Sequence, residues 1–383
     1  MARLGEIFNL QMGKTPARAN NEYWDRGNNP WVSIADLSSY EKYVGATKEL
    51  ITDKAVEESG IKCVPANTVI MSFKLSLGKS AITKTTVYTN EAIIAFIPNG
   101  RYKVSTDYFY HFCSGKDWSV GTNRAVMGAT LNKATLSDMD IDLPAIDIQD
   151  SIAKKLDKVD RLIFLRKQQL SKLDELVKAR FVEMFGDPVS NPHGWEKVKL
   201  SDLANIRIGP FGSLLHKEDY IDGGHPLVNP SHIIDGKITI DEKLTVTSEK
   251  YADMSAYQLQ IGDVVMGRRG EMGRCAVVNE SGLLCGTGSL LIRTKGEVRA
   301  DYIQKIISFP SFKKTIEDMA VGQTMPNLNV PIVSKFQIIK PPIEIQQCYY
   351  TFVEQIDKSK LTIQQSLDKL ELLKKALMQK YFG

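Results

Sequence analysis

Several loops of this sequence combine cationic, amide and hydroxyl side chains with aromatic residues. In the first part of the chain the candidates are Lys14, Thr15, Arg18, Tyr23, Arg26, Lys74, Lys79, Asn123 and Arg124. In the second part they are Ser213, Lys217, Asn229, His232, Arg268, Arg269, Glu271, Arg274, Gln323, Thr324 and Asn327. Lys and Arg contact phosphates, while amides, hydroxyls and guanidiniums hydrogen-bond the edges of bases. The loops are therefore typical of a surface that contacts DNA.

The turn Arg268-Arg269-Gly270-Glu271 carries the most specific chemistry among these loops. Two guanidiniums can grip guanine O6 and N7 or phosphate oxygens, and a carboxylate can accept a hydrogen bond from cytosine N4. The alternative is an ordinary Arg–Glu pair, which is common in exposed turns.

Motifs of DNA-modifying or DNA-cutting enzymes are absent from the sequence. Gly13-Lys14-Thr15 and Gly78-Lys79-Ser80 resemble the end of a phosphate-binding P-loop, but Phe8 and Phe73 stand where that motif requires its first glycine. The five histidines show no spacing of metal ligands. We therefore expect a chain that is not an enzyme and that holds no metal or cofactor of its own.

The composition is that of an ordinary globular protein with a small net charge. The 383 residues exceed the usual size of one hydrophobic core, and the formal net charge is only +4, so DNA contact has to rest on local basic clusters. The five cysteines are far apart and lack zinc-ligand spacing, so we interpret them as reduced core residues. The sequence has no secretion leader and no run of about 20 apolar residues, which favours a cytoplasmic protein without a membrane segment.

The elements that must position these loops are repeated along the chain. Pro144 to Gln149 matches Pro341 to Gln346 at an offset of 197 (341 − 144), and both copies later end on Phe-Gly at the same offset. Such a constant offset indicates an internal duplication. The loops have diverged, since the first copy carries Phe73-Lys74 where the second carries Arg268-Arg269. This change of side chains in a repeated frame favours a contact role for the arginines over a surface ion pair.

Each copy ends in a long amphipathic segment. Apolar residues recur at helical spacing from Ile148 to Met184 and from Ile345 to Tyr381. About 40 residues at a rise of about 1.5 Å make a rod of about 60 Å, which one compact domain does not cover. We therefore predict that the two helices pair as an antiparallel coiled coil. The residues predicted to bind partners are Leu156, Val159, Leu173, Ile356 and Leu370.

Short runs of β-branched and aromatic residues, bounded by Gly, Pro and Asn, fill the rest of each copy. They predict strands at 68–73, 91–97, 263–266 and 289–294, and helices at 107–114 and 301–319. The expected fold class is α+β, with two tandem mixed α/β domains, each followed by a long helix. The expected boundaries are a first domain at 1–143, a helix at 144–186, a linker at 187–196, a second domain at 197–340 and a helix at 341–383.

A set of short motifs follows a fixed order over essentially the whole chain. In the first copy these are Gly13-Lys14-Thr15-Pro16, Tyr23-Trp24 and Pro30-Trp31-Val32, followed by Met184-Phe185-Gly186-Asp187-Pro188 and Gly194-Trp195. In the second copy they are Gly209-Pro210-Phe211-Gly212-Ser213, Gly262-Asp263-Val264-Val265, Arg269-Gly270, Leu328-Asn329 and Pro341-Pro342-Ile343-Glu344-Ile345-Gln346. In their order and tandem repetition the chain resembles the specificity (S) subunit of a type I restriction-modification system.

The resemblance implies that each globular domain is a target-recognition domain for one half of a bipartite DNA site. It also implies that the helices form a spacer and dock methyltransferase subunits, with S-adenosylmethionine, ATP and Mg on modification and restriction partners. The first copy departs from the pattern, because Lys14 replaces a small residue and Phe73-Lys74 lacks the Arg-Gly turn. Two alternatives from other classes are a stand-alone DNA-modifying enzyme with an unrecognised active site and a protein-binding adaptor.

Overall fold

The computed structural model describes residues 1–383 apart from 75, 119–122, 126–127, 212–213 and 321–326. The chain divides into two units, one of residues 1–170 with 362–383 and one of residues 171–361. Within the described ranges, no helix combines the length and apolar character that crossing a membrane requires.

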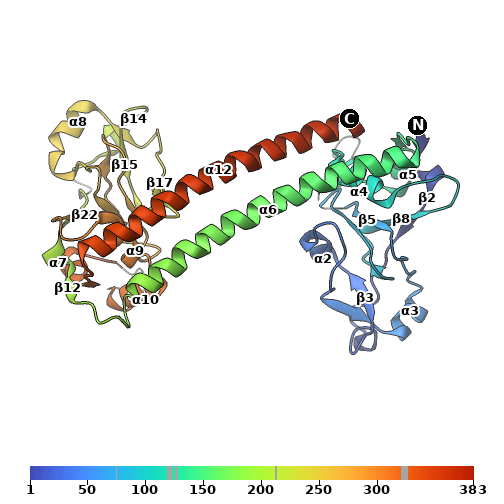
Figure 1. Ribbon diagram of the computed structural model, residues 1–383, viewed down its shortest axis with the longest axis horizontal. Helices are drawn as coiled ribbons and strands as arrows, with labels where there is room; N and C mark the ends of the chain where they lie inside the picture. Colours follow the sequence, from blue (N-terminus) through green and yellow to red (C-terminus); the bar gives the residue numbers. More distant parts are fainter. Residues whose placement is uncertain (75, 119–122, 126–127, 212–213, 321–326) are drawn as a thin grey trace. The chain divides into compact units, whose positions relative to one another are not determined.

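The first unit is built on a four-stranded antiparallel sheet with the strand order β2-β8-β5-β6 (Figure 1). The helix α4 covers this sheet, and its Phe109 packs against Phe8 and Phe96 of β2 and β8. A smaller sheet has the order β4-β3-β7. The strands are β1 (Ala2–Arg3), β2 (Phe8–Met12), β3 (Asn29–Val32), β4 (Glu49–Ile51), β5 (Val69–Ser72), β6 (Ser80–Ile82), β7 (Tyr88–Thr89), β8 (Ile93–Pro98), β9 (Asn123–Ala125), β10 (Gly128–Thr130) and β11 (Asp140–Ile141). The helices are α1 (Leu4–Ile7), η1 (Asn21–Tyr23), α2 (Ile34–Ser39), α3 (Asp53–Ser59), α4 (Thr106–Gly115) and α5 (Lys133–Ser137).

The second unit repeats this architecture, with the strand order β13-β22-β19-β20. Phe8 lies opposite Pro98 in the first sheet, and Ala204 lies opposite Thr294 in the second, so both partners are shifted by the same 196 positions (204 − 8 and 294 − 98). Two tandem copies of one mixed α/β domain are therefore confirmed. The strands are β12 (Lys197–Lys199), β13 (Ala204–Ile208), β14 (Tyr220–Ile221), β15 (His225–Val228), β16 (Ile233–Ile234), β17 (Lys237–Ile238), β18 (Thr245–Val246), β19 (Val264–Gly267), β20 (Cys275–Val277), β21 (Leu284–Cys285), β22 (Ser289–Thr294) and β23 (Gln337–Ile339). The shorter helices are α7 (Leu200–Leu203), η2 (Lys217–Asp219), η3 (Pro230–His232), α8 (Ser248–Asp253), η4 (Ser255–Tyr257), α9 (Ala300–Ile307), α10 (Pro310–Met319) and α11 (Val330–Ser334).

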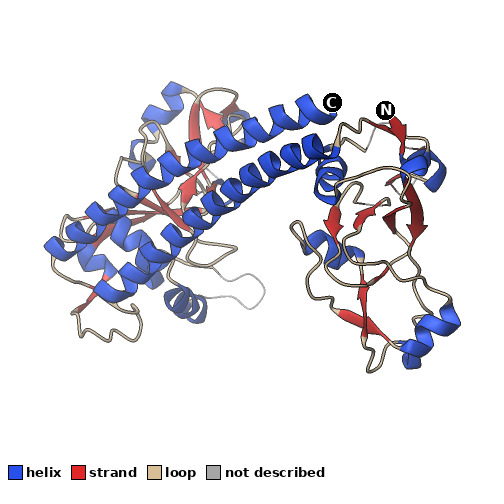
Figure 2. Ribbon diagram, turned by 45° about the vertical axis from the view of Figure 1, so that its right-hand side comes forward, coloured by secondary structure: helices blue, strands red, loops and turns tan. Residues whose placement is uncertain are grey.

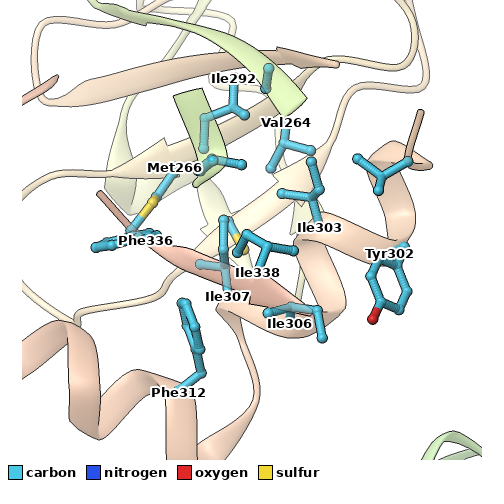
Figure 3. Packing of buried hydrophobic residues seen from close by; sticks show 14 of the residues in the cluster. Val264, Met266, Ile292, Tyr302, Ile303, Ile306, Ile307, Phe312, Phe336 and Ile338 are labelled. Carbon is cyan, nitrogen blue, oxygen red and sulfur yellow. The ribbon is translucent and has the colours of Figure 1, made fainter. Parts of the chain in front are cut away.

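The helix α9 forms the centre of the second core. Figure 3 shows Ile303 of α9 beside Val264 and Ile292 of the sheet, and Ile306 and Ile307 are also fully buried. Each fully buried aliphatic side chain stabilises the fold by about 1.5–3 kcal/mol relative to an exposed one. This burial fixes the sheet edge on which the β19–β20 loop stands.

The helix expected at 301–319 is in fact two helices, α9 and α10. The break falls at Ser308-Phe309, directly before Pro310, which is the first residue of α10. Proline disfavours a helical conformation in the residue before it, and Phe309 is extended at φ −69° and ψ 137°. The prediction of one continuous helix was therefore wrong.

The long helices α6 (Ile146–Phe185) and α12 (Ile343–Phe382) pack side by side within each unit (Figure 2). In the first unit, Asp160 and Lys167 of α6 pair with Lys374 and Glu371 of α12 at 2.7 and 3.1 Å. In the second unit, Asp174 of α6 pairs with Lys360 at 2.5 Å. Partner numbers fall as α6 numbers rise, so the helices run antiparallel.

Residues of α12 complete the core of the first unit, far from its other members in the sequence. The Phe382 ring lies 5.1 Å from the Tyr108 ring and 5.9 Å from the Phe112 ring of α4. The buried side chain of Met378 belongs to the same core cluster. The globular domain and the helix pair therefore share one hydrophobic core.

The cysteines differ in part from the expectation. All five are free thiols, and Cys113, Cys275 and Cys285 are buried. Cys63 and Cys348 are exposed, so the interpretation of all five as core residues was wrong for these two.

Candidate nucleic-acid interface

In the first domain, the loop between β5 and β6 meets the segment that carries Asn123 and Arg124. These two residues lie in β9, which pairs with β10, and the residue after β10, Leu131, donates its backbone N–H to the Phe73 carbonyl at 3.0 Å. Lys74 and Lys79 belong to that β5–β6 loop and are half-buried. The backbone therefore brings four of the predicted contact residues to one sheet edge, although the side chains of Asn123 and Arg124 lie outside the described part.

The second domain repeats this arrangement at the equivalent positions. The Leu328 N–H donates to the Arg268 carbonyl at 2.9 Å, and Arg269 forms a backbone bridge with Asn327. The Arg268 Nε also donates to the Asn327 side-chain oxygen at 3.3 Å. The Arg268, Arg269 and Asn327 predicted from sequence are thus neighbours in space.

A glycine of equivalent position shapes both loops. Gly78 and Gly273 have φ values of +78° and +75°, which favour glycine. A Cβ at Gly273 would stand 2.7 Å from the Ile307 carbonyl oxygen, and one at Gly78 would meet the Trp118 ring at 2.3 Å. The two loops therefore share this glycine turn and the hydrogen bond from a later leucine, while they present different side chains.

The charged groups of the β19–β20 loop have distinct environments. Burial, and secondarily the neighbouring Arg269, lowers the pKa of Arg268. Arg269 itself is exposed, and its side chain makes no hydrogen bond or ion pair within the described ranges. Two adjacent cations without a carboxylate partner form a surface that attracts anions.

Glu271 is engaged within the domain. Its carboxylate accepts hydrogen bonds from Lys313 at 2.7 Å and from the Arg274 guanidinium at 2.9 Å. These hydrogen bonds, that of Lys313 first, lower the pKa of Glu271. The ion pair weighed as an alternative for this turn therefore exists, but it joins Glu271 to Arg274 and Lys313 rather than to Arg268 or Arg269.

Asn229 and His232 flank the same loop from the β15 side. The Arg274 guanidinium donates to the Pro230 carbonyl at 3.2 Å, and this connects the segment to the loop. The His232 ring is only 8% exposed, and its Nδ1 lies 2.8 Å from the Leu227 carbonyl oxygen. The buried ring leaves little surface for a base or a phosphate, whereas half-buried Asn229 stays accessible.

The candidates near the N-terminus surround a separate small core. The Arg18 guanidinium forms a bidentate pair with Glu49 and lies 3.9 Å from the centre of the Trp24 ring. The Tyr23 hydroxyl donates to Glu58 at 2.7 Å, and this hydrogen bond raises the pKa of Tyr23. These contacts give Arg18 and Tyr23 structural partners inside the domain.

Other N-terminal candidates differ in how far they are engaged. Thr15 donates to Glu91, and the Lys14 ammonium donates to the Ser59 carbonyl. Trp31 is fully buried. Arg26 is exposed, and no described residue forms a hydrogen bond or ion pair with its side chain. Ser213, Gln323 and Thr324 lie outside the described residues, and of Lys217 only the backbone, in η2, is described.

The residues predicted to bind partners point largely into the protein. Leu156 is fully buried in the first core, and Val159 is 7% exposed. Leu173, Ile356 and Leu370 are half-buried.

Sequence reasoning missed the apolar residues that the helices expose. All but Leu373 lie off the periodic stripe, and spacing alone does not show which apolar residues remain exposed when the helices pair. In the first unit they include Leu162 at 44%, Leu165 at 37%, Leu372 at 69% and Leu373 at 46%, and in the second Leu176 at 46% and Leu361 at 62%.

Comparison with known proteins explains the repeat. The type I restriction modification DNA specificity domain matches the chain twice, over residues 1–175 and 192–372. The chain belongs to this DNA specificity family. Membership gives it a role in DNA sequence specificity and makes it a non-catalytic subunit.

Curated members of the DNA specificity family match the chain over its whole length or over one half. The MjaIX specificity subunit of Methanocaldococcus jannaschii is 25% identical over 405 residues, which cover 99% of this chain and 91% of that protein. The EcoR124I/EcoR124II specificity subunit of Escherichia coli is 31% identical over 166 residues, or 42% of this chain and 40% of that protein.

Solved structures share the fold of the DNA specificity family. The S subunit of a type I restriction-modification system from M. genitalium has a TM-score of 0.56 at 13% identity, covering 100% of this chain and 95% of that one. A chain from a structure on complex assembly and conformational transition of the type I R-M system has a TM-score of 0.67 at 16% identity, covering 100% and 96%.

Proposed function

We propose that this chain reads a bipartite, asymmetric DNA sequence and directs partner methyltransferase and restriction subunits to it. Each globular domain reads one half-site through the loop between its third and fourth sheet strands, β5–β6 or β19–β20. The observation that carries the proposal is the shared backbone frame of the two loops with different side chains, Phe73-Lys74 in one and Arg268-Arg269 in the other. Because the presented chemistry differs, the two half-sites differ in sequence.

The chemistry of the complete enzyme belongs to the partners in this proposal. Methyl transfer from S-adenosylmethionine takes place on modification subunits, and ATP- and Mg-dependent translocation and cleavage on restriction subunits. Among the described residues, no group of three or more His, Cys, Asp or Glu is arranged to hold a metal ion. Both activities operate on DNA, so we place the assembled complex in the cytoplasm.

Exposed leucines of the long helices support a docking surface for the modification subunits. Leu162 and Leu165 lie one turn apart on α6 and are 44% and 37% exposed, and exposed apolar pairs on a helix favour contact with another protein. Leu162→Gln with Leu165→Gln is expected to weaken co-purification of the modification subunit by tenfold or more, about 1.4 kcal/mol, without unfolding the chain. The matched control is Lys158→Gln with Arg161→Gln, which changes exposed polar residues of the same helix; equal loss in both variants would remove the leucines from the proposal.

The decisive experiment is co-expression with a modification subunit and genome-wide mapping of methylated positions. A split motif, with two defined halves and a gap of fixed length, is the expected result. The proposal would be refuted by methylation that shows no split motif. It would also be refuted by a lack of methylation when the modification subunit binds the chain.

The alternatives predict different outcomes of simple assays. Methyl transfer or cleavage by the purified chain alone would favour a stand-alone enzyme. Absence of sequence-selective DNA protection in the presence of partners would favour a protein-binding adaptor.

A further inference from the structure

The second unit contains a polar hollow of about 790 Å³ beside the β19–β20 loop. Five elements or turns form its walls, namely α6, the β16–β17 turn, the β19–β20 loop, α9 and α10. Four cations line it: Lys178, Arg274, Lys305 and Lys313. Asp174, Asp235 and Glu271 line it as well.

The carboxylates of the hollow leave two of its cations without partners. Glu271 pairs with Arg274 and Lys313, and Asp174 pairs with Lys360. Within the described ranges, the Lys178 and Lys305 ammonium groups make no hydrogen bond or ion pair. The residues outside those ranges include no Asp or Glu. Asp235, at the exposed rim, is the remaining carboxylate.

Lys305 is the less accessible of the two lysines and lies among like charges. It is half-buried on α9, and burial, followed by the nearby ammonium groups of Lys178 and Lys360, lowers its pKa. A folded protein tolerates clustered cations when an anion neutralises them.

In the first domain, the residue equivalent to Lys305 has carboxylate partners on the long helix. Tyr108 and Tyr302 are equivalent, since each donates its hydroxyl hydrogen at 3.0 Å to a backbone carbonyl shortly before the long helix, that of Asp142 directly after β11 or that of Ile339 at the end of β23. The same offset of 194 (302 − 108) aligns Lys305 with His111. His111 contacts Asp157 of α6 at 2.9 Å and lies 4.0 Å from Asp160. The first domain thus supplies its own carboxylates to α4. In the second, the lysine lies near Lys178, Lys360 and Asp174, and the Asp174 carboxylate forms its ion pair with Lys360.

We propose that this hollow is a phosphate-binding site, in which Lys178 and Lys305 neutralise the phosphate oxygens and which Arg274 also lines. Two compact ammonium groups and a guanidinium are the side chains that bind phosphate in proteins. The hollow is large enough for a pyrophosphate group or for backbone phosphates of a DNA strand.

Two kinds of ligand could supply the phosphate group: the DNA backbone or a free phosphate compound. The DNA source rests on the proposed function, because Arg274 links the hollow to the loop that is proposed to read bases. The free source does not depend on it.

Titration of the full-length chain with pyrophosphate at low ionic strength tests the site by calorimetry. Lys178→Gln with Lys305→Gln is expected to lower the affinity at least about tenfold. Lys305→Arg retains the charge and should retain binding. Lys243→Gln removes an exposed lysine of the same unit that lies in another loop, and it should bind as the parent chain does.

A second arm measures DNA binding by the chain with its modification subunits over a range of salt. If the DNA backbone occupies the hollow, the double variant lowers the slope of log affinity against log salt by about 1–2, and pyrophosphate competes with DNA. If a free compound occupies it, pyrophosphate binding is lost while the DNA slope is unchanged.

The proposed site would be overturned if the parent chain did not bind pyrophosphate and the double variant bound DNA as the parent does. The methylated motif distinguishes failure of the phosphate site from failure of the proposed function, because the double variant should still direct methylation to the same split sequence. A parent chain that gives no split motif contradicts the function and leaves the pyrophosphate result standing. Equal loss in Lys243→Gln would show a general charge effect and count against the hollow.

Discussion

Single residues divide into those that present chemistry to solvent and those that hold the domain together. The sequence named Arg269 and Asn327 as candidates, since a turn rich in Arg and Gly and an amide before a Leu-Asn pair are visible as motifs. It could not separate them from Arg18 and Tyr23, because their pairing with Glu49 and Glu58 joins residues that are distant in sequence. Nor does loop composition show that the His232 ring is buried against the Leu227 carbonyl. Burial and pairing are properties of the tertiary structure, and loops with free side chains have the same composition as loops whose side chains are engaged within the domain.

Arg269 is the residue we expect to carry the most base readout in the second domain. Arg269→Ala removes an exposed guanidinium that has no hydrogen-bond or ion-pair partner among the described residues, so the fold should be unaffected. Loss of one guanidinium contact costs about 1–3 kcal/mol, or roughly 5- to 150-fold in affinity for the cognate site. Methylome mapping should show relaxed specificity at one position of one half-site. Arg18→Ala, by contrast, should lower stability through Glu49 and Trp24 and leave the motif unchanged; the reverse pattern would contradict both assignments.

His111 gives the first domain a dependence on pH. The ring is fully buried against Asp157, Asp160 and Lys42, and burial, the largest influence, lowers the pKa of His111 below its ordinary 6.5. As the pH falls below 6.5, the unfolded chain takes up a proton that the folded domain does not, so stability decreases. Above that pH the contribution is fully present.

Thermal unfolding from about pH 7.5 down to about pH 5.5 tests this dependence. The parent chain should lose stability over this window, and His111→Gln should lose less. His216→Gln, at an exposed position, serves as the control and should follow the parent. A His111→Gln variant with the parent's slope would remove His111 as the cause.

Among the elements, the long helices were predictable and the short ones were less so. A periodic stripe over about 40 residues predicts a helix, and α6 and α12 extend over Ile146–Phe185 and Ile343–Phe382. The break between α9 and α10 was missed because the apolar spacing continues through Phe309-Pro310 although the backbone does not. The buried strands β5, β8, β19 and β22 were visible from β-branched runs, but their order in the sheet is set by pairing between distant segments.

The length of the paired helices is expected to set the length of the gap between the two half-sites. Inserting about one helical turn, roughly 5.4 Å, after Leu170 in α6 and after Leu361 in α12 keeps the pairing of both flanking segments. Since one base pair rises about 3.4 Å, the preferred gap should lengthen by about one to two base pairs, as read from methylated positions. Insertion in one helix alone shifts the ion pairs out of register and should abolish methylation. An unchanged gap in the double insertion would contradict this expectation.

At the scale of the whole chain, the duplication makes the two domains separable readers. Replacing residues Ala2 to Asp142 with the corresponding segment of another member of the family should change one half of the methylated motif and leave the other half and the gap intact. A change in both halves would show that the domains do not read independently.

The packing of Phe382 and Met378 against α4 also determines the order in which the molecule can be completed. Residues 171–361 form a unit that is continuous in sequence, so it can fold as soon as it has been synthesised. The first unit also requires residues 362–383, which leave the ribosome about 10 to 40 s after residue 170 at about 5–20 residues per second. Tyr108 and Phe112 therefore lack their contact with Phe382 until the end of translation. The unit that is made first is finished last, and in that interval the part of its core that α12 completes is open to solvent.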